Sequence, residues 1–279
     1  MDEKQPLVNA QILSNTEVAP GYFVLSTEIK EPISKPLPGQ FVMLHLFCKG
    51  DMVLGRPFSI YGFSRRSGRS KLKILYRVVG QGTYYMSLLK RGASIKLMGP
   101  LGHGFELPNR DYRIALVSGG IGVAVLHYLS RFLKASNVTA YLGAKNSTVL
   151  VGLDLMEKNA ASVKVATDDG SYGFHGLVTE LLHQDIQSNA VMPDIIYTCG
   201  PVGMLRAIAA FINRTSVYCE ACIEERMACG TGLCLGCAVA VKEGGRIVYR
   251  RVCKDGPVFL LRDLAWDPSA DDPLNGISI

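Results

Sequence analysis

The sequence contains no long hydrophobic run. Nowhere among its 279 residues do apolar side chains approach the roughly twenty in a row that a membrane-spanning helix needs, so we expect no such helix. The polar start, residues 1–5, is not followed by the apolar core of a secretory signal, which predicts a cytoplasmic protein. Dense lysine and arginine runs are also missing, and the net charge of +6 is mild, which argues against nucleic-acid binding.

Cysteines, by contrast, are plentiful. The chain has eight, and without a secretory signal they indicate metal chemistry in a reducing compartment rather than disulfides. Four of them follow the pattern C-x4-C-x2-C, then fifteen residues and a last cysteine, a spacing that suits a [2Fe–2S] cluster. The predicted ligands are Cys229, Cys234, Cys237 and Cys253.

Glycines are interleaved with these cysteines. Gly230, Gly232 and Gly236 allow tight turns, and the backbone N–H groups brought close to sulfur help to set the reduction potential of a cluster. Zinc is the main alternative, although structural zinc sites usually take two short cysteine pairs. Four unliganded thiols are a third possibility.

The first third of the chain has the pattern of a small β-domain. A chain of this length, 48% hydrophobic and 19% charged, is expected to form two or three domains. Short β-rich runs separated by proline and glycine are typical of an antiparallel barrel or sandwich, and we assign residues 1–108 to it. The predicted strands are Tyr22–Thr27, Gln40–Phe47, Phe58–Gly62, Leu72–Val79 and Ser94–Met98.

Two segments of this domain have binding chemistry. In Arg56-Pro57-Phe58-Ser59, the arginine offers a rigid cationic fork for a phosphate. Gly80-Gln81-Gly82-Thr83 precedes a helical pattern over residues 84–91, and glycines opening a helix let phosphates approach backbone N–H groups. Each segment also has a purely structural explanation: an Arg-Pro pair at a strand start, and a glycine-rich turn.

Strand and helix patterns alternate over residues 109–218, which predicts a doubly wound sheet of parallel strands. Ligands bind such a sheet outside the carboxyl ends of its strands. The predicted strands are Arg113–Val117, Val138–Leu142, Val163–Thr167 and Asp194–Thr198, and the predicted helices cover 123–134, 148–158 and 202–213.

Glycines and a cysteine follow two of these strands. Gly119, Gly120 and Gly122 follow the first, and we predict that they let a dinucleotide approach the backbone, although they do not match G-x-G-x-x-G. Tight packing of strand against helix would also explain them. Cys199 opens Cys199-Gly200-Pro201 after the fourth strand, where a contact with nicotinamide is predicted and a buried structural thiol is the alternative.

In this order the motifs resemble those of the ferredoxin–NADP reductase superfamily. The cysteine motif, entered by Glu224-Glu225-Arg226-Met227-Ala228-Cys229-Gly230, narrows the resemblance to the electron-transfer subunits of NAD-linked dihydroorotate dehydrogenases. The resemblance runs over residues 8–264. It implies an FAD-binding barrel, an NAD-binding α/β domain and a [2Fe–2S] module with a C-terminal tail over residues 219–279.

The resemblance also implies roles for the motif residues. The flavin and its phosphate would contact Arg56, Pro57, Phe58 and Ser59, and the FAD diphosphate would be held by Gly80, Gly82 and Thr83. The nicotinamide nucleotide would face Gly119, Gly120 and Gly122, with Cys199 as the catalytic residue near its reactive ring.

A partner is implied as well. The resemblance predicts an FMN-containing catalytic subunit in a heterotetramer of two plus two. Electrons would pass from dihydroorotate through the partner's FMN, the cluster and FAD to NAD+ in pyrimidine biosynthesis. The alternatives are an NAD(P)H-linked subunit of another redox complex, of sulfide dehydrogenase or hydrogenase type, and a non-catalytic interaction protein that keeps the fold.

Some positions stand apart from the pattern. His103 occupies a place where the family leads us to expect asparagine. Cys219 and Cys222 are spaced as a metal or disulfide pair, but we predict a strand over 216–223, where residues three apart face opposite sides. We therefore predict two separate thiols. Lys145 leaves the choice between NAD and NADP open, and the tail with Trp266 and Asn275 has no predicted role.

Overall fold

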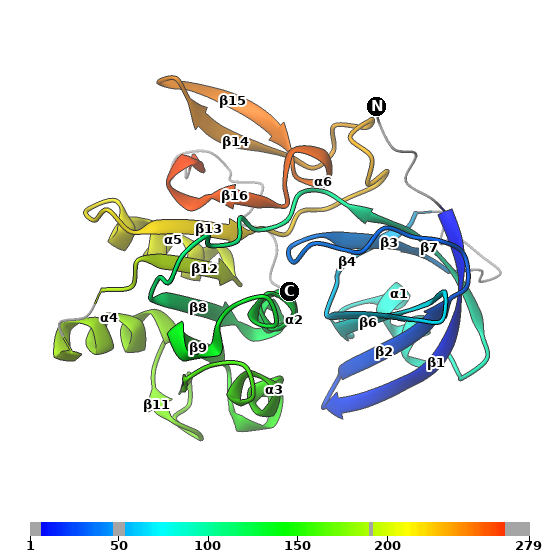
Figure 1. Ribbon diagram of the computed structural model, residues 1–279, viewed down its shortest axis with the longest axis horizontal. Coiled ribbons are helices and arrows are strands. Elements are labelled where there is room, and N and C mark those ends of the chain that lie inside the picture. The colour runs from blue at the N-terminus through cyan, green and yellow to red at the C-terminus, as the bar shows by residue number, and fades with distance from the viewer. Residues whose placement is uncertain (1–6, 47–53, 190–191, 266–279) are drawn as a thin grey trace.

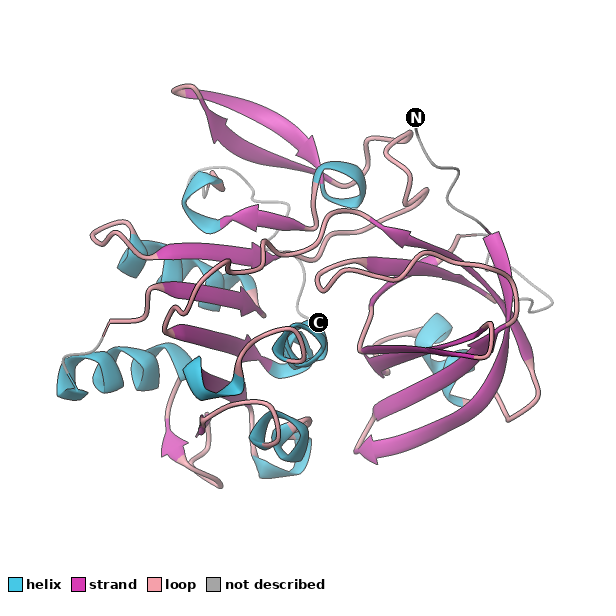
Figure 2. Ribbon diagram, in the orientation of Figure 1, coloured by secondary structure: helices cyan, strands magenta, loops and turns pink. Residues whose placement is uncertain are grey.

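The computed structural model describes residues 7–46, 54–189 and 192–265 (Figure 1; Figure 2). It contains two seven-stranded sheets and a two-stranded hairpin. The predicted strand end at Phe47 and the tail residues Trp266 and Asn275 lie outside the described residues. Within the described ranges, no helix is long and apolar enough to cross a membrane.

The N-terminal sheet is antiparallel and curls round on itself (Figure 1), as the sequence predicts. Its strand order is β4-β3-β7-β1-β2-β6-β5. Val8, Ala10 and Ile12 on alternate positions of β1 are buried, because successive side chains of a strand point to opposite faces. The elements are β1 Leu7–Ala19, β2 Tyr22–Ile29, β3 Phe41–His45, β4 Arg56–Ser59, β5 Gly62–Arg66, β6 Arg69–Arg77, helix α1 Gln81–Ser87 and β7 Ser94–Leu101.

The sequence prediction missed two of these strands. In β1, the register shifts between Ile12 and Ser14, so the apolar alternation is broken along the chain. Strand β5 is nearly all polar after Phe63 and owes its conformation to pairing with β6. The predicted helix over 84–91 is displaced, since α1 begins at Gln81 and ends at Ser87.

The second sheet is parallel, as predicted, except at one edge. Its order is β11-β10-β9-β8-β12-β13-β16, and only the edge strand β16, Val258–Leu260, runs antiparallel to its neighbour. Helices pack on both faces, with α2 and α3 in one buried cluster and α4 and α5 in another. The elements are β8 Ile114–Gly119, η1 Gly120–Gly122, α2 Val123–Ser130, η2 Ala135–Asn137, β9 Val138–Ala144, η3 Ser147–Val149, α3 Leu153–Glu157, β10 Ser162–Thr167, β11 Phe174–His175, α4 Val178–Asn189, β12 Ile195–Cys199, α5 Val202–Ile212 and β13 Tyr218–Cys222.

The helices of this sheet correct the prediction in three places. The helix expected over 148–158 is split into η3 and the short α3, because Gly152 between them has a left-handed φ of 79°. Helix α2 ends at Ser130 instead of continuing to Lys134. Helix α4 was not predicted, although Val178, Leu182 and Ile186 have the i, i+4, i+8 spacing of a helix.

The C-terminal module is a hairpin followed by a strand of the parallel sheet. Its elements are β14 Ala238–Glu243, β15 Arg246–Arg251, α6 Val252–Asp255, β16 Val258–Leu260 and η4 Leu261–Asp263. Gly244 and Gly245, with φ of 56° and 76°, form the hairpin turn. The domain boundary predicted between residues 218 and 219 falls inside β13.

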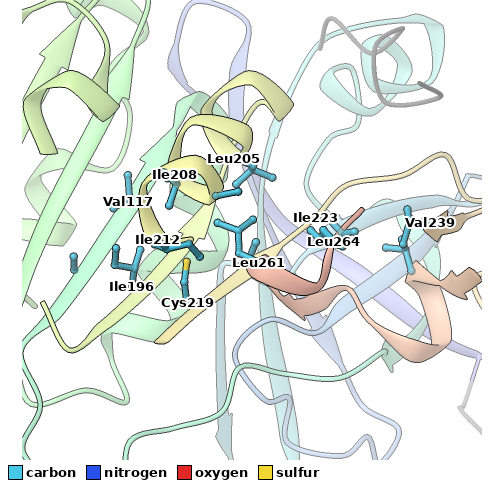
Figure 3. Close-up of a cluster of buried hydrophobic side chains, with 14 of the residues drawn as sticks. Val117, Ile196, Leu205, Ile208, Ile212, Cys219, Ile223, Val239, Leu261 and Leu264 are labelled. Atoms are coloured by element: carbon cyan, nitrogen blue, oxygen red, sulfur yellow. The ribbon is translucent and has the colours of Figure 1, made fainter. Parts of the chain in front are cut away.

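One buried cluster connects this module to the parallel sheet (Figure 3). Val117 and Ile196 come from the sheet, and Ile212 comes from α5. Leu261 and Val239 of the C-terminal module continue the same cluster. The cysteine motif is therefore held against the nucleotide fold by a shared apolar core.

Candidate functional site

A cavity of about 500 Å³ lies where the two sheets and the start of the cysteine motif meet. The curled sheet contributes β4 and the turn before α1, and the parallel sheet contributes Ile121 and Ala124. The segment Cys222–Met227, which leads from β13 into the cysteine motif, completes the wall. Residues from all three predicted domains thus line one cavity.

The two predicted flavin segments come together in this wall. Arg56, Pro57, Phe58 and Ser59 line the cavity beside residues 79–83. A Cβ at Gly82 would fall on Nε of Arg56, so only glycine lets the guanidinium lie against the start of α1. A cation placed over backbone N–H groups is suited to a phosphate.

Thr83 acts on the turn itself. Its hydroxyl accepts hydrogen bonds from the N–H groups of Val79 and Gly80, at 2.9 and 3.1 Å, and donates to the Gly80 carbonyl at 3.0 Å. These bonds fix the turn that precedes α1. Thr83 therefore holds the backbone of the turn that lies beside Arg56 in the cavity wall.

Two charged residues for which the sequence predicted no binding role also line the cavity. Arg77, at the end of β6, has a buried Nε without a hydrogen-bond partner within the described structure. Glu224 faces the same cavity, and burial raises the pKa of its carboxyl while the nearby Arg77 opposes that rise. The Nε–H group of Arg77 is thus available as a hydrogen-bond donor beside the apolar side chains of Phe58 and Leu75. This combination fits a flat ring with several acceptor atoms, such as a flavin.

The glycines after β8 mostly serve close packing. A Cβ at Gly119 would lie 2.6 Å from Cδ of Pro201, and one at Gly122 would fall on the carbonyl of Cys199. The loops that follow β8 and β12 therefore touch through their backbones, which supports the packing alternative at these two positions. Gly120 is different, because its φ is 54° and no other atom approaches its Cβ position.

Cys199 lies at the predicted end of β12 but not in the cavity wall. Its thiol is buried and hydrogen-bonds to the thiol of Cys222, and this bond and burial together raise the pKa of Cys199. Cys222 does line the cavity. Cys219, three residues before it, belongs to the cluster on the other face of the sheet, which confirms that Cys219 and Cys222 are separate thiols.

The four cysteines of the motif gather in two pairs. The thiols of Cys229 and Cys234 are hydrogen-bonded, and so are those of Cys237 and Cys253. Among the residues that the structure describes, no three histidine, cysteine, aspartate or glutamate side chains are grouped as ligands of one metal ion. Two pairs suit a binuclear cluster, in which each iron takes two cysteines, better than one tetrahedral zinc.

Backbone N–H groups point at these sulfur atoms. Those of Thr231 and Cys234 donate to Cys229 Sγ at 3.4 and 3.5 Å, and that of Gly232 donates to Cys253 Sγ at 3.1 Å. Burial alone would raise the pKa of Cys229, but these bonds outweigh it and lower the value to about 6. Such donors favour thiolate, the form that binds iron.

Comparison with known proteins identifies the family. Residues 224–265 match the family model for the iron–sulfur cluster binding domain of dihydroorotate dehydrogenase B. A relative from Caldanaerobacter subterraneus, named dihydroorotate dehydrogenase B (NAD(+)), electron transfer subunit, is 41% identical over 261 residues, covering 93% of this chain and 98% of the relative. A relative of the same name from Clostridium acetobutylicum is 37% identical, covering 94% and 98%. The chain belongs to this family of electron transfer subunits.

Solved structures agree with this family assignment. A chain of an NADH-dependent reduced ferredoxin–NADP oxidoreductase superposes with a TM-score of 0.78 at 29% identity, covering 95% of this chain and 92% of that one. A ferredoxin NADP+ reductase from Neisseria gonorrhoeae, solved with bound FAD and NADP, has a TM-score of 0.61 at 16% identity, covering 81% and 95%. The second likeness shows the fold alone, which is that of ferredoxin reductases.

Two residues singled out in the sequence of this electron transfer subunit lie away from the cavity. His103 donates its backbone N–H to the Gly256 carbonyl at 2.6 Å, which connects the curled sheet to the C-terminal module. Lys145 lies in the loop after β9, where its carbonyl accepts from the N–H of Asp169 at 3.3 Å. The exposed side chains of Asp168 and Asp169 therefore lie at the same end of the sheet as Lys145.

Proposed function

We propose that this chain accepts electrons from a dihydroorotate dehydrogenase catalytic subunit and delivers them to NAD+. The observation that carries the proposal is the cavity shared by all three parts of the chain, because Met227 in its wall lies only two residues before Cys229. The family match over residues 224–265 supports the same conclusion. The cofactors are FAD, a [2Fe–2S] cluster and NAD.

The protein's own residues place these groups. When bound, the flavin exchanges electrons singly with the cluster and as a hydride with nicotinamide, and this chemistry belongs to the cofactors. Arg56 and the turn at Gly82 would hold the FAD diphosphate, and Arg77 would meet an acceptor of the ring. The two cysteine pairs, Cys229 with Cys234 and Cys237 with Cys253, would hold one iron each.

The nucleotide would lie at the carboxyl ends of β8 and β12, next to Gly120 and the Cys199 loop. The carboxylates of Asp168 and Asp169 beyond β10 favour a ribose hydroxyl over a second phosphate, which supports NAD. Seven cysteines of the described chain are free thiols, in keeping with a cytoplasmic location.

The proposed partner is an FMN-containing catalytic subunit, in a complex of two plus two chains. The exposed cluster loop supports a partner at this point, since Cys234 is exposed and Leu233 and Leu235 beside it are 84% and 63% exposed. Apolar side chains at such exposure next to a redox centre suit a surface where another protein delivers electrons.

Reconstitution with the catalytic subunit tests the proposal. The complex should reduce NAD+ with dihydroorotate, whereas the isolated chain should oxidise NADH with an artificial acceptor and leave dihydroorotate unchanged. The similarity to a chain of an NADH-dependent reduced ferredoxin–NADP oxidoreductase favours a second candidate, a subunit of another NAD(P)H-linked complex. Activity with reduced ferredoxin and none with dihydroorotate would select that candidate.

A further inference from the structure

Strands β12 and β13 end side by side at the carboxyl edge of the parallel sheet. Their register pairs Thr198 with Ala221, so the next residues, Cys199 and Cys222, are neighbours across the two strands. Residues at matching positions of adjacent parallel strands point to the same face. Both thiols accordingly belong to the buried cluster on the side of α2 and α3.

The two thiols differ in what they face. Cys222 lines the cavity that fits the flavin, together with Ile223 and Glu224. Cys199 is 2% exposed, does not line that cavity, and is hydrogen-bonded to Cys222. The backbone of Gly122 packs against the backbone of Cys199, because a Cβ at Gly122 would fall on the Cys199 carbonyl.

This arrangement keeps Cys199 in one place and without charge. A buried thiol that is hydrogen-bonded to a second thiol has few alternative rotamers. Its raised pKa, due to the bond with Cys222 and to burial, keeps the Cys199 thiol protonated. An uncharged, polarisable sulfur can pack against a nicotinamide ring without adding charge near the transferred hydride. The rate of hydride transfer depends strongly on how the donor and acceptor rings are positioned.

We propose that Cys222 is a further residue of the nicotinamide–flavin site, whose thiol contacts the bound flavin and holds the Cys199 thiol in a single orientation. Cys222 is then a flavin-contacting residue and also the positioning residue for Cys199. The inference rests on the proposed function, because it takes the cavity to be the flavin site. Cys219, on the same strand but in the opposite cluster, is the matched thiol without this role.

The test compares variants of the full chain: Cys222→Ala, Cys222→Ser and, as the control, Cys219→Ala. The visible spectrum of the bound flavin and NADH oxidation with an artificial acceptor are measured for each. Cys222→Ala should shift the flavin absorption and lower kcat about five- to tenfold, the effect of losing about one hydrogen bond, with little change in KM for NADH. Cys222→Ser keeps a hydrogen-bonding group and should recover most of the lost kcat, while Cys219→Ala should behave as the wild type.

The outcomes separate the inference from the proposed function. A Cys222→Ala protein with the wild-type flavin spectrum and kcat would overturn the inference, and so would equal changes in Cys219→Ala. If Cys222→Ala does not fold, Cys222→Ser is compared with Cys219→Ser, and a flavin shift confined to the first is the expected result. A wild-type chain that binds no flavin and oxidises no NADH would instead refute the proposed function.

Discussion

At the level of single residues, several glycines are needed for the close contacts around the cavity and the cysteine motif. Gly82 leaves room for the guanidinium of Arg56. A left-handed φ of 71° at Gly230 and 82° at Gly232 lets the cysteine loop turn, and a Cβ at Gly230 would lie 2.5 Å from Cγ of Met43 in the curled sheet. The cysteine motif thus packs directly on the curled sheet.

The first prediction concerns Gly82→Ala. The added methyl group must displace the Arg56 guanidinium, and the loss of a charge-assisted hydrogen bond should weaken FAD binding about ten- to a hundredfold. Titration of the flavin-free protein with FAD measures the change. Gly203→Ala in α5 is the control, because Gly203 does not line the cavity and no other atom lies within 4 Å of its Cβ position. Equal weakening in both variants would contradict the assigned role of Arg56.

The second prediction concerns the cluster ligands. The purified chain should contain iron, acid-labile sulfide and flavin at about 2:2:1. Cys234→Ala should lose the iron and sulfide, because one iron is left with a single cysteine, whereas the double change of Cys219 and Cys222 to alanine should keep them. Stoichiometric zinc without sulfide, or iron retained only in Cys234→Ala, would show that the ligand assignment is wrong.

At the level of the strands, hydrogen bonds between the residues that precede β8 and β12 hold these two strands in register. Asp194 precedes β12 and accepts hydrogen bonds from Nε, Nη2 and the backbone N–H of Arg113, which precedes β8. These bonds lower the pKa of Asp194. The pair therefore fixes the two strands whose far ends support Gly119 and Cys199.

The third prediction is the pH dependence of Asp194→Asn. Because the folded-state pKa is lowered, the stabilisation is fully present above the unfolded value of about 3.9 and is lost as the pH falls through the folded value. The variant should melt about 1–3 °C below the wild type at pH 7, and the difference should shrink below about pH 4. Asp111→Asn is the control, because it breaks a more exposed ion pair with Lys134 and should lower the melting temperature less. If the difference in melting temperature between Asp194→Asn and the wild type grew in acid, the lowered pKa of Asp194 would not be the source of the stabilisation.

At the scale of the whole molecule, the cavity joins three parts of the chain that are far apart in sequence. Arg56 belongs to the curled sheet, Ala124 to the nucleotide fold, and Met227 to the approach to the cysteine motif. The apolar cluster of Figure 3 keeps the C-terminal module in place. A flavin bound in this cavity would therefore lie next to both the nucleotide fold and the approach to the cysteine motif.

The fourth prediction separates these two exchanges. Cys237→Ala should remove the cluster but leave the flavin cavity intact, since Cys237 does not line it. NADH oxidation with an artificial acceptor should persist at a rate close to the wild type, while dihydroorotate-dependent NAD+ reduction in the reconstituted complex should fall to background. Retention of the second activity in a variant proven free of iron would mean that electrons bypass the cluster.

The local features of this protein could be predicted from its amino-acid sequence. Cysteine spacing, the glycine-rich turns and the alternation of strands with helices are visible in short stretches of chain, where backbone preference and apolar periodicity act directly. Sequence periodicity did not reveal β1 and β5, whose conformations depend on partner strands. No place in the cavity wall was predicted for Arg77, which lies in no motif, or for Cys222, which was predicted only to be a separate thiol.

The contacts between distant functional groups, by contrast, depend on the folded arrangement of the strands. The guanidinium of Arg56 reaches Gly82 because β4 and α1 line the same cavity. Cys199 meets Cys222 because β12 and β13 are parallel and in a register that pairs Thr198 with Ala221, and a shift of one residue would turn one thiol to the opposite face. Such contacts join residues distant in the chain, so their geometry follows from strand order and core packing, which no short stretch of sequence specifies.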